Sequence, residues 1–207
     1  MSNTHSSPPG NSDYAAVREL VAERAGRKWC LFLDRDGVIN RQIAGDYVRD
    51  WCDFEWLPRA RLALKALSAW APHLVVVTNQ QGIGRGLMSA ADVAAIHDNF
   101  RAELAADGVM MDAIQVCPHL DSAACTCRKP RPGLVLDWLR QHPDIDRSLC
   151  VMVGDSQSDL ELAHEVAFET GGCASIRIGS GATHSVIADA EFGTLWDFAV
   201  AVERACE

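Results

Sequence analysis

The stretch LFLDRDGVIN, at residues 31–40, joins a strand pattern to a cluster of charge. Residues 29–33 are apolar and bounded by charged residues, which is typical of a strand buried on both faces. Asp34 and Asp36 follow directly, and Gly37 lets the backbone turn sharply after them. In open α/β sheets, ligands bind just beyond the carboxyl ends of the strands. The stretch is therefore either a solvated acidic turn or the start of a site in which both carboxylates face one ligand.

Three later segments also pass from an apolar run into polar residues. Residues 73–78 (HLVVVT) lead into NQQGIGRG, so Thr78 stands at a strand end before a glycine-rich turn. Such a turn is a common connection, but it also suits phosphate binding by side-chain and backbone donors. Residues 113–116 lead into a cluster of cysteines and cations, and residues 149–153 lead into GDSQSD, which places Asp155 at a strand end. Four strand ends therefore carry chemically useful side chains.

Helical patterns separate these strands. They cover the residues 14–25, 58–70, 89–107, 134–140, 160–167 and 191–205. One further strand is predicted at residues 175–178. Strands that alternate with helices predict an α/β fold with a doubly wound parallel sheet. We expect a single domain at residues 14–207, preceded by a disordered Ser/Pro/Gly/Asn-rich tail at residues 1–13.

Composition and charge limit the class of protein. The chain has 207 residues and a formal net charge of −9. It therefore lacks the basic balance that general nucleic-acid binding requires. No apolar run is long enough to span a bilayer, and residues 1–13 lack the apolar core of a signal peptide. We expect a cytoplasmic monomer whose partner is a small molecule, not a nucleic acid or a membrane.

Three cysteines and a histidine crowd into the window CPHLDSAACTC. They are Cys117, His119, Cys125 and Cys127. Their number and spacing match a closed tetrahedral zinc site, which leaves no coordination position for a substrate and is therefore structural. Chance clustering of reduced thiols is the alternative, and the histidine and the paired spacing disfavour it. The other five of the eight cysteines are scattered and predict no disulfide framework.

Four motifs taken in order, DRDG, TNQ, RKPRPG and GD, resemble those of the haloacid dehalogenase (HAD) superfamily of phosphohydrolases. The resemblance implies a HAD-like, Rossmannoid sheet without a large cap domain, with a zinc-stapled loop. It implies that Asp34 is the nucleophile and Asp36 the general acid/base. Thr78 would bind the phosphoryl group, Lys129 would be the motif III lysine, and Asp155 would be the metal-binding acid.

The carboxylates and cations of these motifs suit the chemistry of phosphate transfer. A carboxylate cannot approach a phosphate dianion unless their repulsion is neutralised, and hard divalent cations with oxygen ligands do this. We expect Mg²⁺ to be bound by Asp34, the backbone carbonyl of Asp36 and Asp155. Asp34 would then form an aspartyl-phosphate, and Asp36 would protonate the departing oxygen and later activate water. Thr78 and Lys129 would offset the charge on the transferring oxygens.

The resemblance over residues 29–167 narrows to the zinc-containing D-glycero-D-manno-heptose 1,7-bisphosphate phosphatases, with histidinol-phosphate phosphatases as close relatives. Without a cap, the loops at residues 42–47, 80–86 and 128–131 would select the substrate. The predicted substrate contacts are Tyr47, Asn79, Gln80, Gln81, Arg85 and Arg128. Zinc would hold Arg128 and Lys129 rigidly over the site.

Charge favours the sugar bisphosphate. The loops hold more arginines than carboxylates, which suits a substrate that keeps a second phosphate, with Arg128 as its contact. The five-residue gap between His119 and Cys125 instead resembles histidinol-phosphate phosphatases. We predict hydrolysis of the 7-phosphate of a heptose 1,7-bisphosphate, with histidinol phosphate as the alternative. A non-catalytic zinc-stabilised binding module is disfavoured because no catalytic position is lost, and a DNA-end phosphatase is disfavoured by the acidic balance.

Overall fold

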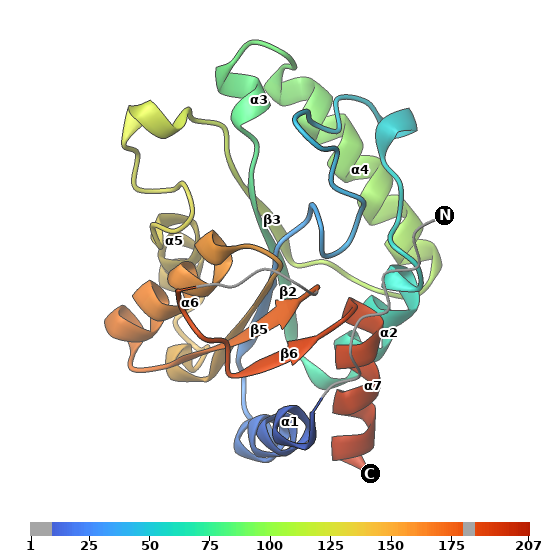
Figure 1. The fold of residues 1–207 in the computed structure, drawn as a ribbon, viewed down its shortest axis with the longest axis vertical. Coiled ribbons are helices and arrows are strands. Elements are labelled where there is room, and N and C mark those ends of the chain that lie inside the picture. Colours follow the sequence, from blue (N-terminus) through green and yellow to red (C-terminus); the bar gives the residue numbers. More distant parts are fainter. Residues whose placement is uncertain (1–9, 180–184) are drawn as a thin grey trace.

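Six parallel strands form one sheet in the computed structural model, which describes residues 10–179 and 185–207 (Figure 1). They are β1 (Cys30–Leu33), β2 (His73–Asn79), β3 (Ala113–Cys117), β4 (Cys150–Gly154), β5 (Cys173–Ile178) and β6 (Ala190–Phe192). The strand order is β3-β2-β1-β4-β5-β6. The order changes direction between β1 and β4, and ligands bind at such a switch point in open α/β sheets.

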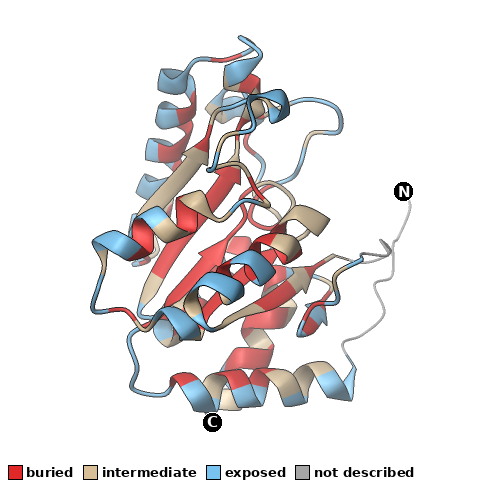
Figure 2. Cartoon of the chain, turned by 90° about the vertical axis from the view of Figure 1, so that its left-hand side faces the viewer, coloured by how far each residue is buried: buried red, intermediate tan, exposed pale blue. Residues whose placement is uncertain are grey.

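Helices cover both faces of the sheet, so the predicted doubly wound α/β fold is confirmed (Figure 2). The helices are α1 (Asn11–Arg24), α2 (Ala60–Trp70), α3 (Gln81–Gly84), α4 (Ala90–Ala106), α5 (Gly133–Gln141), α6 (Gln157–Thr170) and α7 (Leu195–Cys206). Alternate strand residues face opposite layers. In β1, Leu31 and Leu33 pack with α1, α2, α4 and α7, whereas Phe32 packs with α5 and α6.

The end of the chain differs from the prediction. Residues 191–205 were expected to form one helix, but Phe192 ends the edge strand β6, and α7 starts only at Leu195. Thr194 caps α7 by accepting a hydrogen bond from the Asp197 N–H, which fixes the helix start after the strand. The buried side of α7 is made by Leu195, Phe198, Ala199, Ala201 and Val202.

The start of the chain also differs. Residues 11–13, which were assigned to the disordered tail, are the first turn of α1, and Asp13 closes that turn by accepting a hydrogen bond from the Gly10 N–H. Residues 1–9 of the predicted tail lie outside the described residues. Within the described residues, no helix is both long enough and apolar enough to cross a membrane.

An aromatic cluster anchors the segment between β1 and α2 against α4. Trp51 stacks on Phe54 with ring centroids 4.7 Å apart, and Trp56 stacks on Phe100 of α4 at 5.3 Å. The indole N–H of Trp56 also donates to Glu103 at 2.9 Å. Aromatic pairs add about 0.5–1.5 kcal/mol each beyond the area that they bury. The cluster therefore fixes the loop that reaches the carboxyl edge of the sheet.

Candidate active site

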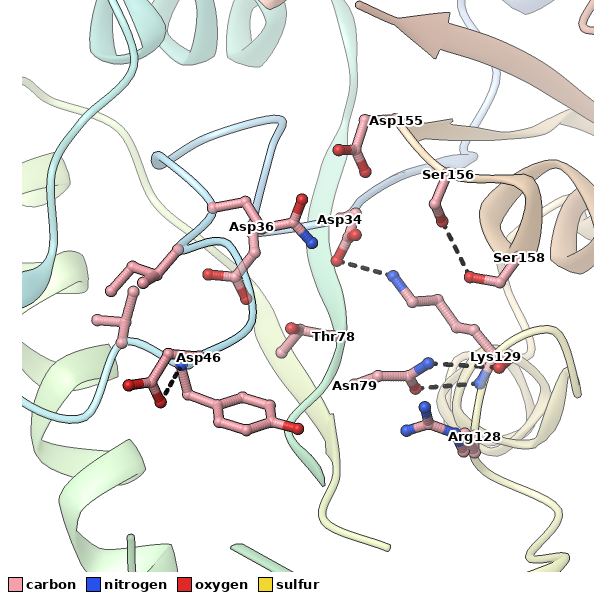
Figure 3. A pocket seen from close by; sticks show the side chains of 14 residues that line it. Asp34, Asp36, Asp46, Thr78, Asn79, Arg128, Lys129, Asp155, Ser156 and Ser158 are labelled. Atoms are coloured by element: carbon pink, nitrogen blue, oxygen red, sulfur yellow. Dashed lines mark hydrogen bonds and ion pairs between the residues drawn. The ribbon is translucent and has the colours of Figure 1, made fainter. Parts of the chain in front are cut away.

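A cavity of about 260 Å³ lies at the carboxyl edge of the sheet (Figure 3). The ends of β1, β2 and β4 reach it, together with the loop that follows β3. Its lining residues are Asp34, Asp36, Gln42, Ile43, Asp46, Tyr47, Val48, Thr78, Asn79, Arg128, Lys129, Asp155, Ser156 and Ser158. Every residue predicted for catalysis therefore faces one cavity, although these residues come from distant parts of the chain.

Lys129 reaches between two carboxylates at the floor of this cavity. Its Nζ lies 2.7 Å from Asp34 Oδ1 and 2.6 Å from Asp159 Oδ1. Burial by itself would lower the pKa of Lys129, but the charges of Asp159 and Asp34 outweigh burial and raise it. Asp159 is fully buried in the first turn of α6, where its other oxygen accepts hydrogen bonds from the backbone and hydroxyl of Ser156. Lys129 is therefore a fixed cation beside Asp34.

Three carboxylates crowd this end of the cavity. Asp34, Asp155 and Asp159 each place an oxygen within 4.8 Å of the others. Burial, reinforced by the charge of Asp159, raises the pKa of Asp155 to about 6, and burial also raises the pKa of Asp34 despite the opposing charge of Lys129. One ammonium therefore does not balance the three carboxylates. A hard divalent cation with oxygen ligands fits this donor set and its excess negative charge.

Asp36 has different surroundings from Asp34. Its carboxylate accepts hydrogen bonds from Arg35 Nη2 at 3.0 Å to both oxygens, from Asn40 Nδ2 at 2.9 Å and from Gln80 Nε2 at 2.9 Å. Burial alone would raise the pKa of Asp36, but Arg35 and the amide donors outweigh it and hold this pKa below its usual range. The pKa of Asp34 is thus raised and that of Asp36 lowered. Carboxyl groups whose pKa values are shifted apart are common in acid–base sites.

The end of β2 ties the cavity to the loop that carries Lys129. Asn79 accepts a hydrogen bond from the backbone N–H of Lys129 at 3.1 Å and donates to its carbonyl at 3.3 Å. Thr78 is buried and accepts a hydrogen bond from Gln80 Nε2 at 2.8 Å. The Asn79 amide therefore holds the backbone of Lys129 in place, while the hydroxyl of Thr78 lines the cavity.

Gly37 permits the close approach of Asp155. It adopts a φ of +91°, which favours glycine, and a Cβ at this position would overlap the Asp155 carboxylate. Glycine is thus required at position 37 for two reasons: the turn needs a positive φ, and Asp155 occupies the space that a side chain would fill.

The four predicted zinc ligands meet beside the cavity. The Sγ atoms of Cys117, Cys125 and Cys127 lie 3.3, 3.4 and 3.7 Å from one another. His119 Nδ1 lies 3.1 Å from Cys127 Sγ and 3.7 Å from Cys117 Sγ. Ligands about 2.3 Å from a tetrahedral ion would be separated by about 3.8 Å, so the cluster has the size and the donors of such a site. All eight cysteines are free thiols, in keeping with the expected lack of a disulfide framework.

The substrate contacts predicted from sequence are only partly brought together. Tyr47, Asn79 and Arg128 line the cavity. Gln80 is buried against Asp36 and Thr78, and neither Gln81 nor Arg85 is among the lining residues. Arg85 instead lies over the ring of Tyr47, with its guanidinium carbon 5.9 Å from the ring centroid.

Sequence reasoning missed some of the side chains that shape the site. Arg35 and Asn40 contact Asp36, and Ser156 and Ser158 line the cavity. Asp159 accepts a hydrogen bond from the Ser156 N–H at the start of α6 and also pairs with Lys129. The capping signature at Ser156 was visible in sequence, but the ion pair joins residues 30 positions apart and has no local signal.

Comparisons with known proteins agree with this geometry. A family model described as HAD-hydrolase-like matches residues 126–192. A curated D-glycero-alpha-D-manno-heptose-1,7-bisphosphate 7-phosphatase from Mycobacterium bovis is 66% identical over 186 residues, which are 90% of this chain and 97% of the relative. A D-glycero-beta-D-manno-heptose-1,7-bisphosphate 7-phosphatase from Rhodopseudomonas palustris is 38% identical over 146 residues, 67% of this chain and 79% of that relative.

A solved structure is also similar. The D,D-heptose 1,7-bisphosphate phosphatase from B. bronchiseptica, complexed with magnesium and phosphate, has a TM-score of 0.72 and 31% identity. The match covers 85% of this chain and 98% of that chain. With the motif residues gathered in one cavity and relatives of this identity and coverage, the chain belongs to the HAD superfamily phosphatases, in the family that includes the heptose-1,7-bisphosphate 7-phosphatases.

Proposed function

We propose that this phosphatase removes the 7-phosphate from D-glycero-α-D-manno-heptose 1,7-bisphosphate. The observation that carries the proposal is the 66% identity, over nearly the whole length of the relative, to a curated enzyme with that name. The α anomer is chosen because the relatives of 65–66% identity are named for it, whereas the relatives of 35–39% identity include enzymes named for either anomer. Of the loop arginines that favoured a bisphosphate in the sequence, Arg128 lines the cavity, and it supports the proposal.

Arg128 supports a substrate that carries a second phosphate. Its guanidinium is mostly buried at the cavity wall, next in sequence to Lys129. Its Nε lies 3.4 Å from exposed Asp121, while its Nη1 is buried and has no hydrogen-bond partner within the described part of the chain. A buried donor without a partner is unfavourable, and a phosphate oxygen would satisfy it. We assign Arg128 to the phosphate that remains on the product.

The proposed chemistry begins at Asp34. Its carboxylate attacks phosphorus, the bond to the sugar oxygen breaks, and an aspartyl-phosphate forms. Asp36 delivers a proton to the departing oxygen and then takes a proton from the water that cleaves the intermediate. The lowered pKa of Asp36 keeps it ionised and so suits it to take the proton from water. The negative charge of an incoming phosphate raises this pKa, which favours the protonated form that delivers a proton to the departing oxygen. Lys129 and Thr78 bind the transferring oxygens.

We further propose that Asp34, Asp155 and the backbone carbonyl of Asp36 hold Mg²⁺, since the carboxylate cluster has the donors and the excess negative charge for it. When bound, Mg²⁺ would neutralise the repulsion between Asp34 and the phosphate. Zn²⁺ is proposed for Cys117, His119, Cys125 and Cys127, where it would fix the loop that carries Arg128 and Lys129. A cytoplasmic location and a monomeric state stay predictions, and the elution volume of the purified protein tests the second.

Gly37→Ala tests the metal site. The new methyl group would displace Asp155, so we expect the apparent Mg²⁺ affinity in a phosphatase assay to fall ~10–100-fold. Gly108→Ala is the matched control, because Gly108 has a similar φ of +80° and open space at its Cβ position. Both variants carry the same backbone strain, so an equal Mg²⁺ dependence in the two would contradict the proposed role of Asp155.

Histidinol phosphate remains the alternative because of the five-residue gap between His119 and Cys125. An ammonium and an imidazole on the substrate would require carboxylates apart from the catalytic set. Asp46 lines the cavity, but it is paired with Arg49 at 2.6 Å, and Asp121 is paired with Arg128. This arrangement favours the sugar bisphosphate.

The function is tested by phosphate release from a panel that contains both anomers of the heptose bisphosphate, histidinol phosphate and other sugar phosphates. We expect the highest kcat/KM for the α-heptose bisphosphate. A higher kcat/KM for histidinol phosphate would overturn the substrate assignment and leave the phosphatase class in place.

Arg128→Ala should separate substrate binding from chemistry. Loss of a charge-assisted contact to the second phosphate is expected to raise KM for the bisphosphate roughly 10-fold or more, equivalent to about 1.5–3 kcal/mol. KM for an aryl phosphate, which has no second phosphate, should change little. Arg128→Lys should recover part of the loss, since it keeps the charge. Equal effects of Arg128→Ala on both substrates would contradict the assignment of this residue.

A further inference from the structure

An arginine lies between the two aspartates of the motif, and its side chain is almost completely buried. Arg35 is 1% exposed. Its Nη2 donates to both oxygens of Asp36 at 3.0 Å, and its Nη1 lies 2.9 Å from Nε2 of His97. A buried guanidinium is stable only when it is paired and hydrogen-bonded. Asp36 provides the charge, and His97 provides the second contact.

The imidazole of His97 is neutral and acts as the acceptor. His97 lies on α4 and is buried, with the cations Arg35 and Arg101 and the carboxylate of Asp36 around it. Burial and the charges of the two arginines lower the pKa of His97 to about 3. Because a guanidinium can only donate, Nε2 accepts the 2.9 Å hydrogen bond from Arg35 Nη1, which places the ring proton on Nδ1.

This contact fixes the direction from which Arg35 approaches Asp36. The other donors to that carboxylate are Asn40, in the same turn, and Gln80, after β2. No residue of α4 is among those that line the cavity, so His97 connects this helix to the catalytic group through Arg35. The guanidinium of Arg35 is thereby held through Nη1 by a histidine of the helix and through Nη2 by the carboxylate that it orients.

We propose that His97 and Arg35 are positioning residues that hold the Asp36 carboxylate in the orientation needed to protonate the departing oxygen. Neither residue is among those that line the cavity. The proposal rests on the proposed phosphatase mechanism and adds a specific role for the helix behind the motif. A misplacement of a catalytic group by about 1 Å can lower a rate about 10²-fold. Loss of the hydrogen bond between Arg35 and His97 could therefore lower the rate measurably by letting Asp36 shift.

The proposal predicts an effect that depends on the leaving group. A sugar alkoxide is a poor leaving group and needs the proton from Asp36 as its bond to phosphorus breaks. A nitrophenolate leaves as a stabilised anion and needs no proton. Because kcat/KM reports the first irreversible step, a badly placed Asp36 should lower kcat/KM for a sugar phosphate far more than for 4-nitrophenyl phosphate.

The experiment compares His97→Leu with His97→Gln in the full-length protein. Leucine fills a similar volume without an acceptor, whereas glutamine keeps an acceptor oxygen for Arg35. We expect His97→Leu to lower kcat/KM for the heptose bisphosphate ~10–10²-fold, mainly through kcat, and to change kcat/KM for 4-nitrophenyl phosphate less than about threefold. His97→Gln should recover most of the loss. Ile96→Val, a truncation at the neighbouring buried position on α4, controls for altered packing and should leave both activities unchanged.

Arg35→Lys gives a second test if His97→Leu does not fold, because it keeps the charge and cannot contact both Asp36 and His97 in the same way. It should show the same selective loss on the heptose bisphosphate. Equal losses on the two substrates, or a His97→Gln variant no better than His97→Leu, would overturn the positioning role while the phosphatase assignment stands. Inactivity of the unmodified protein on both substrates would instead contradict the proposed function and this inference with it.

Discussion

Asp34→Asn is expected to abolish phosphomonoester hydrolysis while the protein stays folded. An amide cannot act as the nucleophile, and removal of a covalent catalyst lowers kcat on the order of 10⁴-fold or more. The fold should persist because Lys129 keeps its ion pair with Asp159 at 2.6 Å. Replacing the Asp34 carboxylate with an amide also reduces the repulsion among the three crowded carboxylates. The burial that raises the pKa of Asp34 makes its ionised form unfavourable in the metal-free protein, so a neutral amide is tolerated there.

The measurement is steady-state phosphate release, with thermal unfolding as the check on the fold. Asp46→Asn is the matched control, because it makes the same chemical change in the same cavity outside the catalytic set. It should leave the turnover of an aryl phosphate near normal. Substantial turnover by Asp34→Asn would rule out the covalent mechanism.

Cys127→Ser should abolish the proposed zinc binding and most of the activity together. Cys127 Sγ lies 3.3 and 3.4 Å from the other two sulfurs and 3.1 Å from His119 Nδ1, so it contacts every other member of the cluster. Without zinc the loop loosens, and Lys129, two residues further on, loses its position beside Asp34. We expect kcat/KM to fall roughly 10²-fold, the scale of a misplaced catalytic group.

Metal analysis of the purified protein checks this prediction. We expect about one zinc per chain in the unmodified protein, retained through EDTA treatment that removes Mg²⁺, and none in Cys127→Ser. Cys206→Ser is the control, since Cys206 is an exposed free thiol at the end of α7. Unmodified protein that contains no zinc when purified without chelator would contradict the proposed site, and a zinc-free variant of normal activity would contradict its role in positioning Lys129.

The sequence indicated the fold and the gathering of the proposed catalytic residues in one cavity, because both have local signals. Each strand is a short apolar run. Asp34 and Asp155 stand just after the last residue of a strand, and Thr78 is the next-to-last residue of another. Parallel strands place such positions at one edge, so the pattern alone predicted that these side chains would meet. The short spacing from Cys117 to Cys127 predicted the cluster in the same way.

The parts that sequence reasoning missed depend on contacts between distant segments. Arg35 and His97 are 62 positions apart, and either one alone is unremarkable in sequence. The three-residue strand β6 is recognisable only through its pairing with β5, and Phe192 continued the apolar pattern of the helix that follows. Arg85 was expected to contact the substrate because it lies in a glycine-rich loop, but its guanidinium packs over Tyr47.

The most direct test of the account is to follow the reaction with the heptose bisphosphate by ³¹P NMR and to identify the monophosphate product. The proposed activity should yield heptose 1-phosphate and inorganic phosphate, with the α anomer consumed faster than the β anomer. Formation of the 7-phosphate, or consumption of histidinol phosphate at a higher kcat/KM than the α-heptose bisphosphate, would contradict it.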